Sequence, residues 1–240
     1  MHERRHLRGA GPDDRGLFDP GGLARVRAAV SDYSWLLSRT YAPESALKLV
    51  GDRYQLAARQ RAAVSKSACA DAALAGRAGR RLVPAELEGR SLLVDTFNTC
   101  IGVEVALSGG PLFVGRDGAC RDLAGVHGSY GRVLETSTAL DCLFEGLARC
   151  RPGAVTWFLD RPVSNSGALA SLLRERGERL GLSWGVELVD DADRHVIARG
   201  AVALSADGAV LDAAEHWFDL AGWVVRERVP DAWLIELATT

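Results

Sequence analysis

The chain divides into two stretches that differ in how apolar and polar positions alternate. Over residues 23–75 the apolar positions recur at helical spacing. From Ser91 onward, short apolar runs of strand length alternate with longer segments of helical period. Strands that alternate with helices predict a parallel sheet with helices on both of its faces. We therefore expect a small, basic, all-helical domain at 1–88 and a three-layer α/β domain at 89–240.

The second stretch contains several apolar runs, bounded by turn residues, that predict strands. These runs are 92–94, 112–114, 155–159, 184–189, 201–204 and 233–237. Helices are expected between them, at 97–107, around the apolar stripe 133–147, around the stripe 169–180 and after residue 207. A further apolar segment, 223–225, precedes the last predicted strand.

Three of the predicted strands run into an aspartate. Asp95 and Asp160 follow an apolar run directly, and Asp207 follows one after two residues. In an open parallel sheet the carboxyl ends of the strands meet at one edge, and ligands bind there. Carboxylates held close together repel each other unless a cation neutralises them, and hard oxygen ligands suit Mg²⁺ or Mn²⁺. The three aspartates are therefore candidate metal ligands and catalytic residues, although Asp95 alone is equally explained as a helix N-cap.

A metal site of this kind usually has a fourth acid. Asp122 and Glu135 are the candidate further metal ligands, with Glu104 behind them on the first predicted helix. The aspartates of segment 190–193 also follow a predicted strand. Because they are crowded in a turn, we interpret them as part of a solvated loop.

Other polar residues near the strand ends are candidates for binding substrate. They are Asn98, Ser205, Arg121, His127 and Arg161. Asn98 is placed either to orient Asp95 or to bind substrate. Ser205 is placed to bond either Asp207 or a phosphate.

The helical stretch carries a pattern typical of a helix-turn-helix. Two short helices flank the segment 51–56, and Arg59, Arg61 and Lys66 belong to the second. Such a helix can enter a DNA major groove, but the same arrangement is a common way to pack a small helical domain. Residues 1–88 carry a net charge of +5 and the remainder −7. This asymmetry is compatible with a nucleic-acid-binding arm beside an acidic metal site, and equally with ordinary surface variation.

Composition narrows the setting of the protein. The sequence has 240 residues and a net charge of −2, without the run of about 20 apolar residues that spans a membrane. Its first residues lack the apolar core of a secretory signal. The five cysteines form no CxxC pair, which disfavours a disulfide framework or a zinc site. We expect a cytoplasmic protein without a membrane partner, and the oligomeric state stays open.

Three segments resemble a known group of nuclease domains. LLVDTFN resembles the opening strand of PIN-like and NYN-type nuclease domains, VTWFLDRPVSNSG their later strand with another metal-site aspartate, and VALSADGAVLD their Ser/Thr-x-Asp strand ending. The resemblance implies a PIN-like (Rossmann-like) fold and a Mg²⁺- or Mn²⁺-dependent nuclease, with RNA more than DNA as its partner. Through SALKLVGDRY, GVHGSYGRV and DRPVSNSG, the whole chain also resembles an uncharacterised prokaryotic family with a helical N-terminal domain of unknown function.

Departures from this pattern leave an alternative open. Ala206 and Gly208 flank Asp207 where some PIN-like domains have further acids, so a non-catalytic nucleic-acid-binding or regulatory protein of the same fold is the rival interpretation. Other enzyme classes fit less well. Phe97 occupies the place of the second aspartate of haloacid-dehalogenase phosphatases, and no GxGxxG of a dinucleotide-binding fold is present. The segment 128–131 does not match the GxSxG of serine hydrolases.

Overall fold

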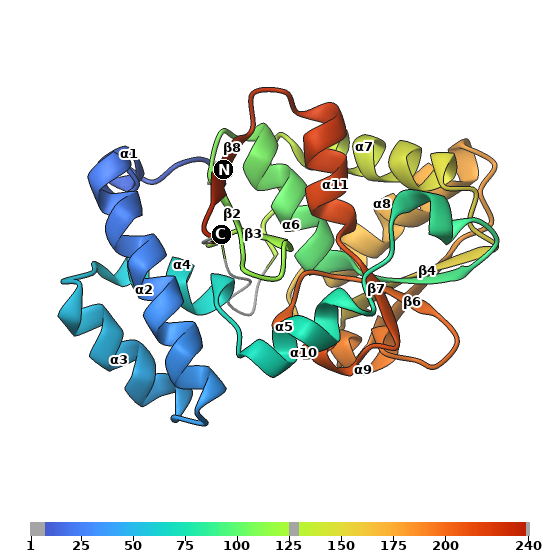
Figure 1. Cartoon of the computed structure of the whole chain (residues 1–240). Coiled ribbons are helices and arrows are strands. Elements are labelled where there is room, and N and C mark those ends of the chain that lie inside the picture. Colours follow the sequence, from blue (N-terminus) through green and yellow to red (C-terminus); the bar gives the residue numbers. More distant parts are fainter. Residues whose placement is uncertain (1–7, 125–129, 239–240) are drawn as a thin grey trace.

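Five parallel strands form the main sheet of the molecule, in a computed structural model that describes residues 8–124 and 130–238. The strands lie in the order β5-β4-β1-β6-β7 (Figure 1). Their bounds are β1 Ser91–Asp95, β4 Ala154–Asp160, β5 Gly185–Val189, β6 Val202–Leu204 and β7 His216–Phe218. Apolar residues fill the central strands because both faces of a parallel sheet are covered. Leu92, Trp157 and Leu204, for example, are fully buried.

Helices cover both faces of this sheet. One face carries α6 Thr96–Leu107, α7 Thr136–Arg149, α8 Ser166–Arg179 and α11 Leu220–Arg228, and the other carries α9 Ala192–Val196 and α10 Gly208–Ala213 (Figure 1). Leu93 and Ala203 pack in the core beside α9 and α10, whereas their neighbours Leu92 and Leu204 pack in the core of the opposite face. Side chains alternate in this way along any strand. The predicted three-layer α/β architecture is confirmed.

The strand order reverses between β1 and β6. The chain moves from β1 outward to β4 and β5, and then returns to place β6 and β7 on the other side of β1. The outward connections carry α6, α7 and α8, whereas α9 and α10 lie on the opposite face, before and after β6. Such a reversal is a topological switch point. In open α/β sheets, ligands bind in the crevice at the carboxyl ends of the two strands that flank it.

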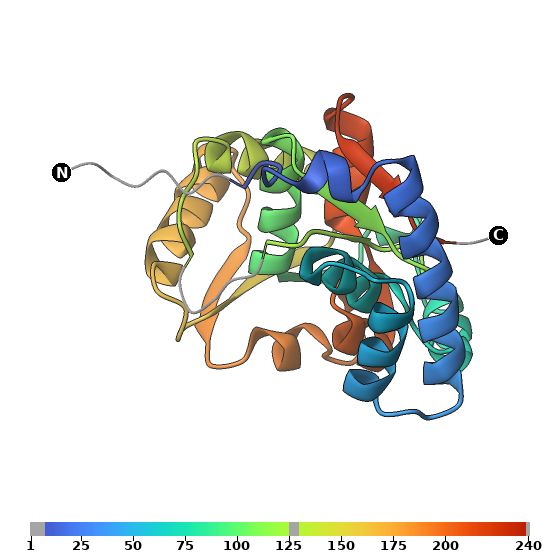
Figure 2. The same cartoon turned by 90° about the vertical axis from the view of Figure 1, so that its left-hand side faces the viewer.

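A second sheet joins the N-terminal helices to the rest of the molecule. Its strands, in the order β3-β2-β8, are β2 Pro111–Val114, β3 Cys120–Arg121 and β8 Trp233–Glu236. The N-terminal helices are α1 Asp14–Leu17, α2 Pro20–Ser38, α3 Pro43–Arg53, α4 Ala58–Ser67 and α5 Asp71–Ala78, followed by a 3-10 turn at Pro84–Leu87. Figure 2 shows the blue helices of this part against the green and red strands of the second sheet.

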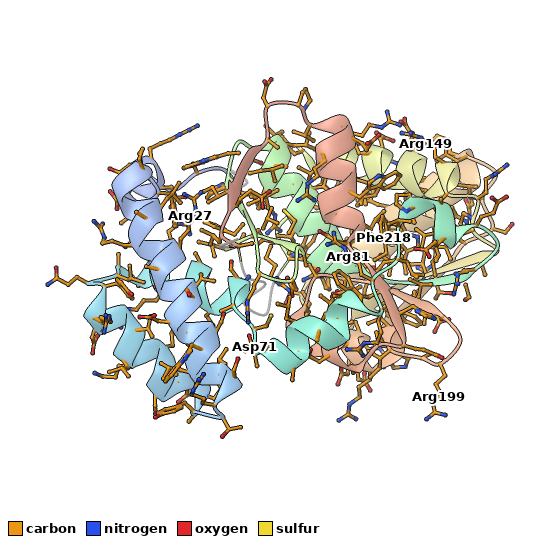
Figure 3. The ribbon with its side chains drawn as sticks, in the orientation of Figure 1. Arg27, Asp71, Arg81, Arg149, Arg199 and Phe218 are labelled. Carbon is orange, nitrogen blue, oxygen red and sulfur yellow. The ribbon has the colours of Figure 1, made fainter. Side chains whose placement is uncertain are left out.

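The N-terminal helices share a buried core with the second sheet. Its members include Phe18, Val26 and Val30 from the helices and Phe113, Ile235 and Leu237 from the strand region. Two arginines add contacts to the last strand. The guanidinium of Arg15 lies 4.1 Å from the ring centroid of Trp233, and Nε of Arg27 donates to the carbonyl of Glu236 at 2.9 Å. Figure 3 labels Arg27 on α2. The first helices and the last strand therefore stabilise each other.

Some elements differ from the sequence pattern. The run 112–114 forms a strand, as predicted, but it pairs in the second sheet. β7 has no counterpart among the predicted strands, because its three residues are too short a run to show an alternation. The apolar segment 223–225 lies inside α11, whose N-cap Asp219 accepts the backbone N–H of Gly222 at 2.8 Å.

Two further expectations concern single features of the chain. In the described part of the protein, no helix combines the length and the apolar character that crossing a membrane requires. All five cysteines are free thiols, and four of them are buried.

Candidate functional site

The three predicted aspartates lie at the same edge of the main sheet. Asp95 is the last residue of β1 and Asp160 is the last of β4, and these strands are hydrogen-bonded neighbours. Asp207 comes three residues after β6, which pairs with β1 on its other side. Because the strands are all parallel, the three residues lie at the carboxyl edge, beside the switch point between β1 and β6.

Hydrogen bonds tie the end of β1 to the end of β6. Oγ of Ser205 donates to Oδ2 of Asp95 at 2.8 Å and accepts the backbone N–H of Asp207 at 3.0 Å. Oδ1 of Asn98 accepts the backbone N–H of Ala206 at 2.8 Å. Asp95 is also the N-cap of α6, since its Oδ1 accepts the backbone N–H of Asn98 at 3.3 Å. Both roles of Asp95, helix cap and member of an acidic edge, are therefore present together.

Asp95 has a strongly shifted pKa. Only 6% of the residue is exposed. Burial raises the pKa of Asp95 to about 7 and the charges of Asp193 and Asp207 add to the rise, while hydrogen bonds from Ser205 and the Asn98 backbone oppose it. Near neutral pH this carboxyl group is therefore present in both its protonated and its charged form.

Asp193 is an acid of the site that the sequence pattern did not reveal. It is the second residue of α9, which packs against β1 and β4. The backbone N–H of Ala192 donates to Oδ1 of Asp160 at 2.8 Å, which places the start of α9 beside the end of β4. Asp193 is exposed as a residue, but partial desolvation of its carboxyl group raises the pKa of Asp193 to about 6, and the carboxylates of Asp207 and Asp160 contribute. Asp95, Asp160, Asp193 and Asp207 thus form one electrostatically coupled group, which we call the acidic cluster.

The segment 190–193 is not uniformly a solvated loop. Asp190 is exposed, as expected, but Asp191 is the N-cap of α9 and accepts the backbone N–H of Arg194 at 3.2 Å. Buried Ala192 and Val196 stand four residues apart on the inner side of this helix. That spacing after an N-cap aspartate is the local signal for a short helix, and hence for an ordered Asp193.

The acidic cluster has the oxygen ligands of a cation site, but its carboxylates are not close enough together to hold one ion. Among residues 8–124 and 130–238, no three His, Cys, Asp or Glu side chains are placed to hold a metal ion together. Carboxylate oxygens are nevertheless the ligands that hard divalent cations prefer, and a coupled set of negative charges is what such an ion neutralises. The residues therefore fit Mg²⁺ or Mn²⁺ by chemistry, and binding requires the carboxylates to approach one another.

A cleft of about 440 Å³ opens beside Asp207. Asn98, in the first turn of α6, and Asp207, in the loop after β6, line one part of it, and Asp122 lines another. Lys66 brings the C-terminal end of α4 to the same cleft. The volume lies within the range of pockets for small ligands.

Two buried arginines hold the loop that follows β6. Nε of Arg121 donates to the carbonyl of Ala206 at 2.6 Å, and Nη2 of Arg77 donates to the carbonyl of Gly208 at 3.1 Å. Both arginines also bind Asp117, Arg121 with two bonds of 2.8 and 2.7 Å and Arg77 with one of 2.6 Å. Arg121, a predicted substrate-binding residue, lines the cleft, but its guanidinium is already engaged within the protein.

Comparison with known families places the chain. A family model described as a domain of unknown function (DUF5616) matches residues 84–223, and one described as a protein of unknown function (DUF434) matches residues 25–80. The chain belongs to the DUF5616 family. A protein of Methanocaldococcus jannaschii, named as uncharacterised, is 26% identical over 180 residues, which cover 75% of this chain and 86% of that protein. No solved structure matches the chain significantly.

The acidic cluster lies in one of the two matched segments, whereas residues of both segments line the cleft. The four acids lie within the DUF5616 segment, whereas Lys66 and Arg77 lie within the DUF434 segment. The cleft is therefore built from both segments. The expectation of an uncharacterised family, in which an N-terminal segment of unknown function precedes the α/β part, is confirmed.

The predicted additional metal ligands lie apart from the acidic cluster. Asp122 is buried in the cleft wall, where its Oδ1 accepts the backbone N–H of Ala124 at 2.7 Å. Burial raises the pKa of Asp122, and the charge of Lys66 opposes this rise. Glu135 immediately precedes α7 and does not line the cleft. It is also not one of the carboxylates that raise the pKa of Asp95 or Asp193.

Glu104 serves the packing of α6 against its surroundings. Its carboxylate is fully buried and accepts hydrogen bonds from the Tyr130 hydroxyl and, at 2.6 Å, from Oγ1 of Thr136. The guanidinium of Arg8 completes the set with an ion pair of 2.6 Å. These partners occupy both carboxylate oxygens, so Glu104 is a structural anchor rather than a fourth acid of the edge.

The remaining predicted residues do not contribute to the acidic cluster as the structure describes it. Arg161 is exposed and pairs with Asp190 at 3.0 Å, and His127 lies outside the described residues. The segment 181–185, GLSWG, matches GxSxG, yet Ser183 precedes β5 at the amino edge of the sheet. A nucleophile of this type needs a strand-to-helix turn at the carboxyl edge, so a serine hydrolase site is not formed there.

The two helices of the predicted helix-turn-helix are α3 and α4. The cations of α4 make contacts within the protein, Arg59 with Asp14, Arg61 with Asp52 at 2.8 Å, and Lys66 with the carbonyl of Asp122 at 2.8 Å. The C-terminal end of α4 contributes to the lining of the cleft. In this arrangement the second helix forms part of a wall beside the acidic cluster.

Proposed function

We propose that this protein hydrolyses phosphodiester bonds in nucleic acid with the help of Mg²⁺ or Mn²⁺, and that RNA is its preferred substrate over DNA. One observation carries the proposal: carboxylates from β1, β4, α9 and the loop after β6 are coupled at the topological switch point. Like charges in such an arrangement disfavour each other until a cation neutralises them. The resemblance of LLVDTFN, VTWFLDRPVSNSG and VALSADGAVLD to PIN-like nuclease domains supports the same activity.

Each residue of the site has a part in this chemistry. Asp95, Asp160, Asp193 and Asp207 are the residues that would hold the ion or ions, which when bound supply an activated water and stabilise the leaving oxygen. Ser205 fixes the orientation of the Asp95 carboxylate through its 2.8 Å bond. The pKa of Asp95, about 7, also suits this group to exchange a proton near neutral pH. The cleft beside Asp207 receives the substrate.

Cleavage of pooled RNA and single-stranded DNA by the full chain, with Mg²⁺, Mn²⁺ or EDTA, tests the proposal. The wild type should cut RNA only when a divalent ion is present. Asp95→Asn keeps the shape of the side chain but removes its charge, so the rate should fall more than about 100-fold. Loss of a residue that only hydrogen-bonds a metal ligand costs about 100-fold at most. Asp190→Asn is the matched control, because Asp190 is exposed at the same edge and pairs with the exposed Arg161.

Metal-induced stabilisation is the second readout of the same experiment. An ion that binds the folded state raises the melting temperature by mass action. The wild type and Asp190→Asn should show this rise, and Asp95→Asn should lose it. If Asp95→Asn keeps both the wild-type rate and the wild-type melting shift, Asp95 is only a helix cap and the hydrolase proposal fails.

A non-catalytic nucleic-acid-binding protein is the second candidate. It is favoured by the hydrogen bonds that Asp160 and Asp207 already make to the backbone N–H groups of Ala192 and Ala209, each at 2.8 Å. Asp207 in this way caps α10, and Asp160 satisfies the first backbone N–H of α9, so neither carboxylate requires an ion. For this candidate, the wild type binds RNA but leaves it intact with every ion, and Asp95→Asn binds as the wild type does.

A further inference from the structure

Lys66 is one of only two lysines in the sequence, the other being Lys48. The other basic side chains are arginines, apart from the five histidines. The two residue types differ in how they bind anions. An arginine makes rigid, planar pairs, whereas a lysine ammonium is a compact charge on a flexible stem that turns between several acceptors. Lys66 therefore gives the cleft a type of cation that occurs only twice in the sequence.

The ammonium group of Lys66 has no carboxylate partner at contact distance. Its Nζ donates to the main-chain carbonyl of Asp122 at 2.8 Å, and within the described part of the chain it forms no ion pair. The two arginines of the cleft are different, because Arg77 is bound to Asp117 and Asp212, and Arg121 to Asp117. Lys66 is therefore the cleft cation that can accept an anionic ligand without breaking an ion pair.

The position of Lys66 connects it to the acidic cluster. Lys66 and Asp207 line the same cleft, one from α4 and the other from the loop after β6. Asn98 lines it as well, and since its Oδ1 accepts the backbone N–H of Ala206, its Nδ2 is the group left to donate to a ligand. A volume of about 440 Å³ suits one small unit of a polymer. Proteins take unpaired bases and their backbone into sites of limited size, which favours a single strand over a duplex as the ligand.

We propose that Lys66 binds a phosphate of a single-stranded nucleic acid beside the acidic cluster. The DUF434 segment then supplies a substrate-binding cation for chemistry carried by the DUF5616 segment. The nature of the anion rests on the proposed function. An ammonium has three donors, so Lys66 keeps its bond to the Asp122 carbonyl while a second donor turns to the phosphate. In this arrangement α4 binds the substrate of the cleft instead of reading a DNA groove.

Binding of a short fluorescent single-stranded RNA to the full chain tests this proposal. Asp95→Asn serves as the background, with Mg²⁺ present, so that the strand stays intact. Lys66→Met keeps the aliphatic stem and removes the charge, and Lys48→Met is the matched control, because the Lys48 side chain is exposed on α3. Lys66→Met should weaken binding about tenfold and lower the slope of log K against log salt by about 0.7, the contribution of one phosphate contact in a single strand. Lys66→Arg should restore part of the affinity, and Lys48→Met should change neither quantity.

Acetylation of lysines in the otherwise unmodified wild type provides a readout that does not depend on a variant. Peptide mass spectrometry compares the modification of Lys66 and Lys48 with and without the RNA. The RNA should protect Lys66, whereas Lys48 reacts equally in both samples and serves as the internal reference. If Lys66→Met folds poorly, the protection of Lys66 decides the question.

The outcomes separate this inference from the proposed function. Unchanged affinity and salt slope in Lys66→Met, together with an unprotected Lys66, overturn the role of Lys66 even if the wild type cuts RNA. Conversely, a wild type that cuts nothing but protects Lys66 and depends on it for binding overturns the hydrolase proposal. The assignment of Lys66 as a phosphate-binding residue then stands.

Discussion

The hydroxyl of Ser205 donates a hydrogen bond to Oδ2 of Asp95 at 2.8 Å, from the end of β6 to the end of β1. The same hydroxyl oxygen accepts the backbone N–H of Asp207 at 3.0 Å, so its proton is directed toward Asp95. The bond favours the charged form of a carboxylate that burial and neighbouring acids disfavour. The loop after β6 therefore influences how strongly Asp95 holds a proton.

Asp95 should make the stability of the protein depend on pH. Its pKa is about 7 in the folded state and near 3.8 without the fold, so between these values the folded state binds more protons than the unfolded state. The free energy of unfolding should therefore fall as the pH rises from about 4 to about 7, by a few kcal/mol for this group. Asp95→Asn should flatten that decline. Thermal melts in EDTA at constant ionic strength measure it, and equal slopes in the two proteins would contradict the raised pKa.

Ser205→Ala should raise the pKa of Asp95 further. The substitution removes the hydrogen bond that stabilises the Asp95 carboxylate, at a cost of about 1 kcal/mol when that group is charged. Titration of ¹³C-labelled aspartate carboxyl groups by NMR should show the Asp95 midpoint at higher pH than in the wild type. Ser183→Ala, at the opposite edge of the sheet, is the control and should leave the midpoint in place. A midpoint that stays the same in Ser205→Ala would mean that the hydroxyl does not serve Asp95.

Asp193→Asn should have the opposite effect on Asp95. The charge of Asp193 is the largest electrostatic contribution to the raised pKa of Asp95 after burial, so its removal should lower the midpoint of Asp95 in the same NMR titration. Under the proposed function, the substitution should also weaken the melting shift that Mn²⁺ produces. Asp190→Asn should reproduce neither effect. An unchanged Asp95 midpoint would remove Asp193 from the acidic cluster.

Arg121→Met should destabilise the protein strongly. Arg121 is buried and makes two bonds to Asp117, so its loss leaves part of a buried carboxylate unpaired, at a cost of about 3–5 kcal/mol. Arg161→Met is the control, because the exposed pair of Arg161 with Asp190 contributes less than about 1 kcal/mol. Urea unfolding of the three proteins measures the difference. Equal midpoints for both variants would show that Arg121 does not hold the site together.

The centre of the main sheet was predictable because β1 and β4 are mainly apolar runs that end in a polar residue. The segments before Asp95 and Asp160 carry this signal for a strand covered on both faces. The second sheet has no such local signal. Its strand Pro111–Val114 pairs with Trp233–Glu236, which begins 122 residues later in the sequence, and only the folded chain brings them together.

The candidate site was predictable in position and less so in membership. Asp95, Asp160 and Asp207 share a strand-end pattern, whereas Asp193 sits in a short helix whose start is hidden among adjacent aspartates. Arg121 looks like a substrate-binding residue in sequence, because its engagement with Asp117 and with a distant carbonyl depends on the tertiary fold. Local patterns indicate which residues reach an edge, but not which of them are already paired there.

The packing of the first helices on β8 affects how this protein folds during translation. Arg27 is translated 206 residues before Trp233, which lies in the strand that Arg15 and Arg27 contact. The nascent N-terminal helices therefore expose part of their apolar face until this strand has been translated. Chains generally fold from the N-terminus as they emerge, and exposed apolar surface at that stage attracts chaperones or other nascent chains. A ribosome stalled shortly before codon 233 should therefore carry helices that a protease still cuts readily.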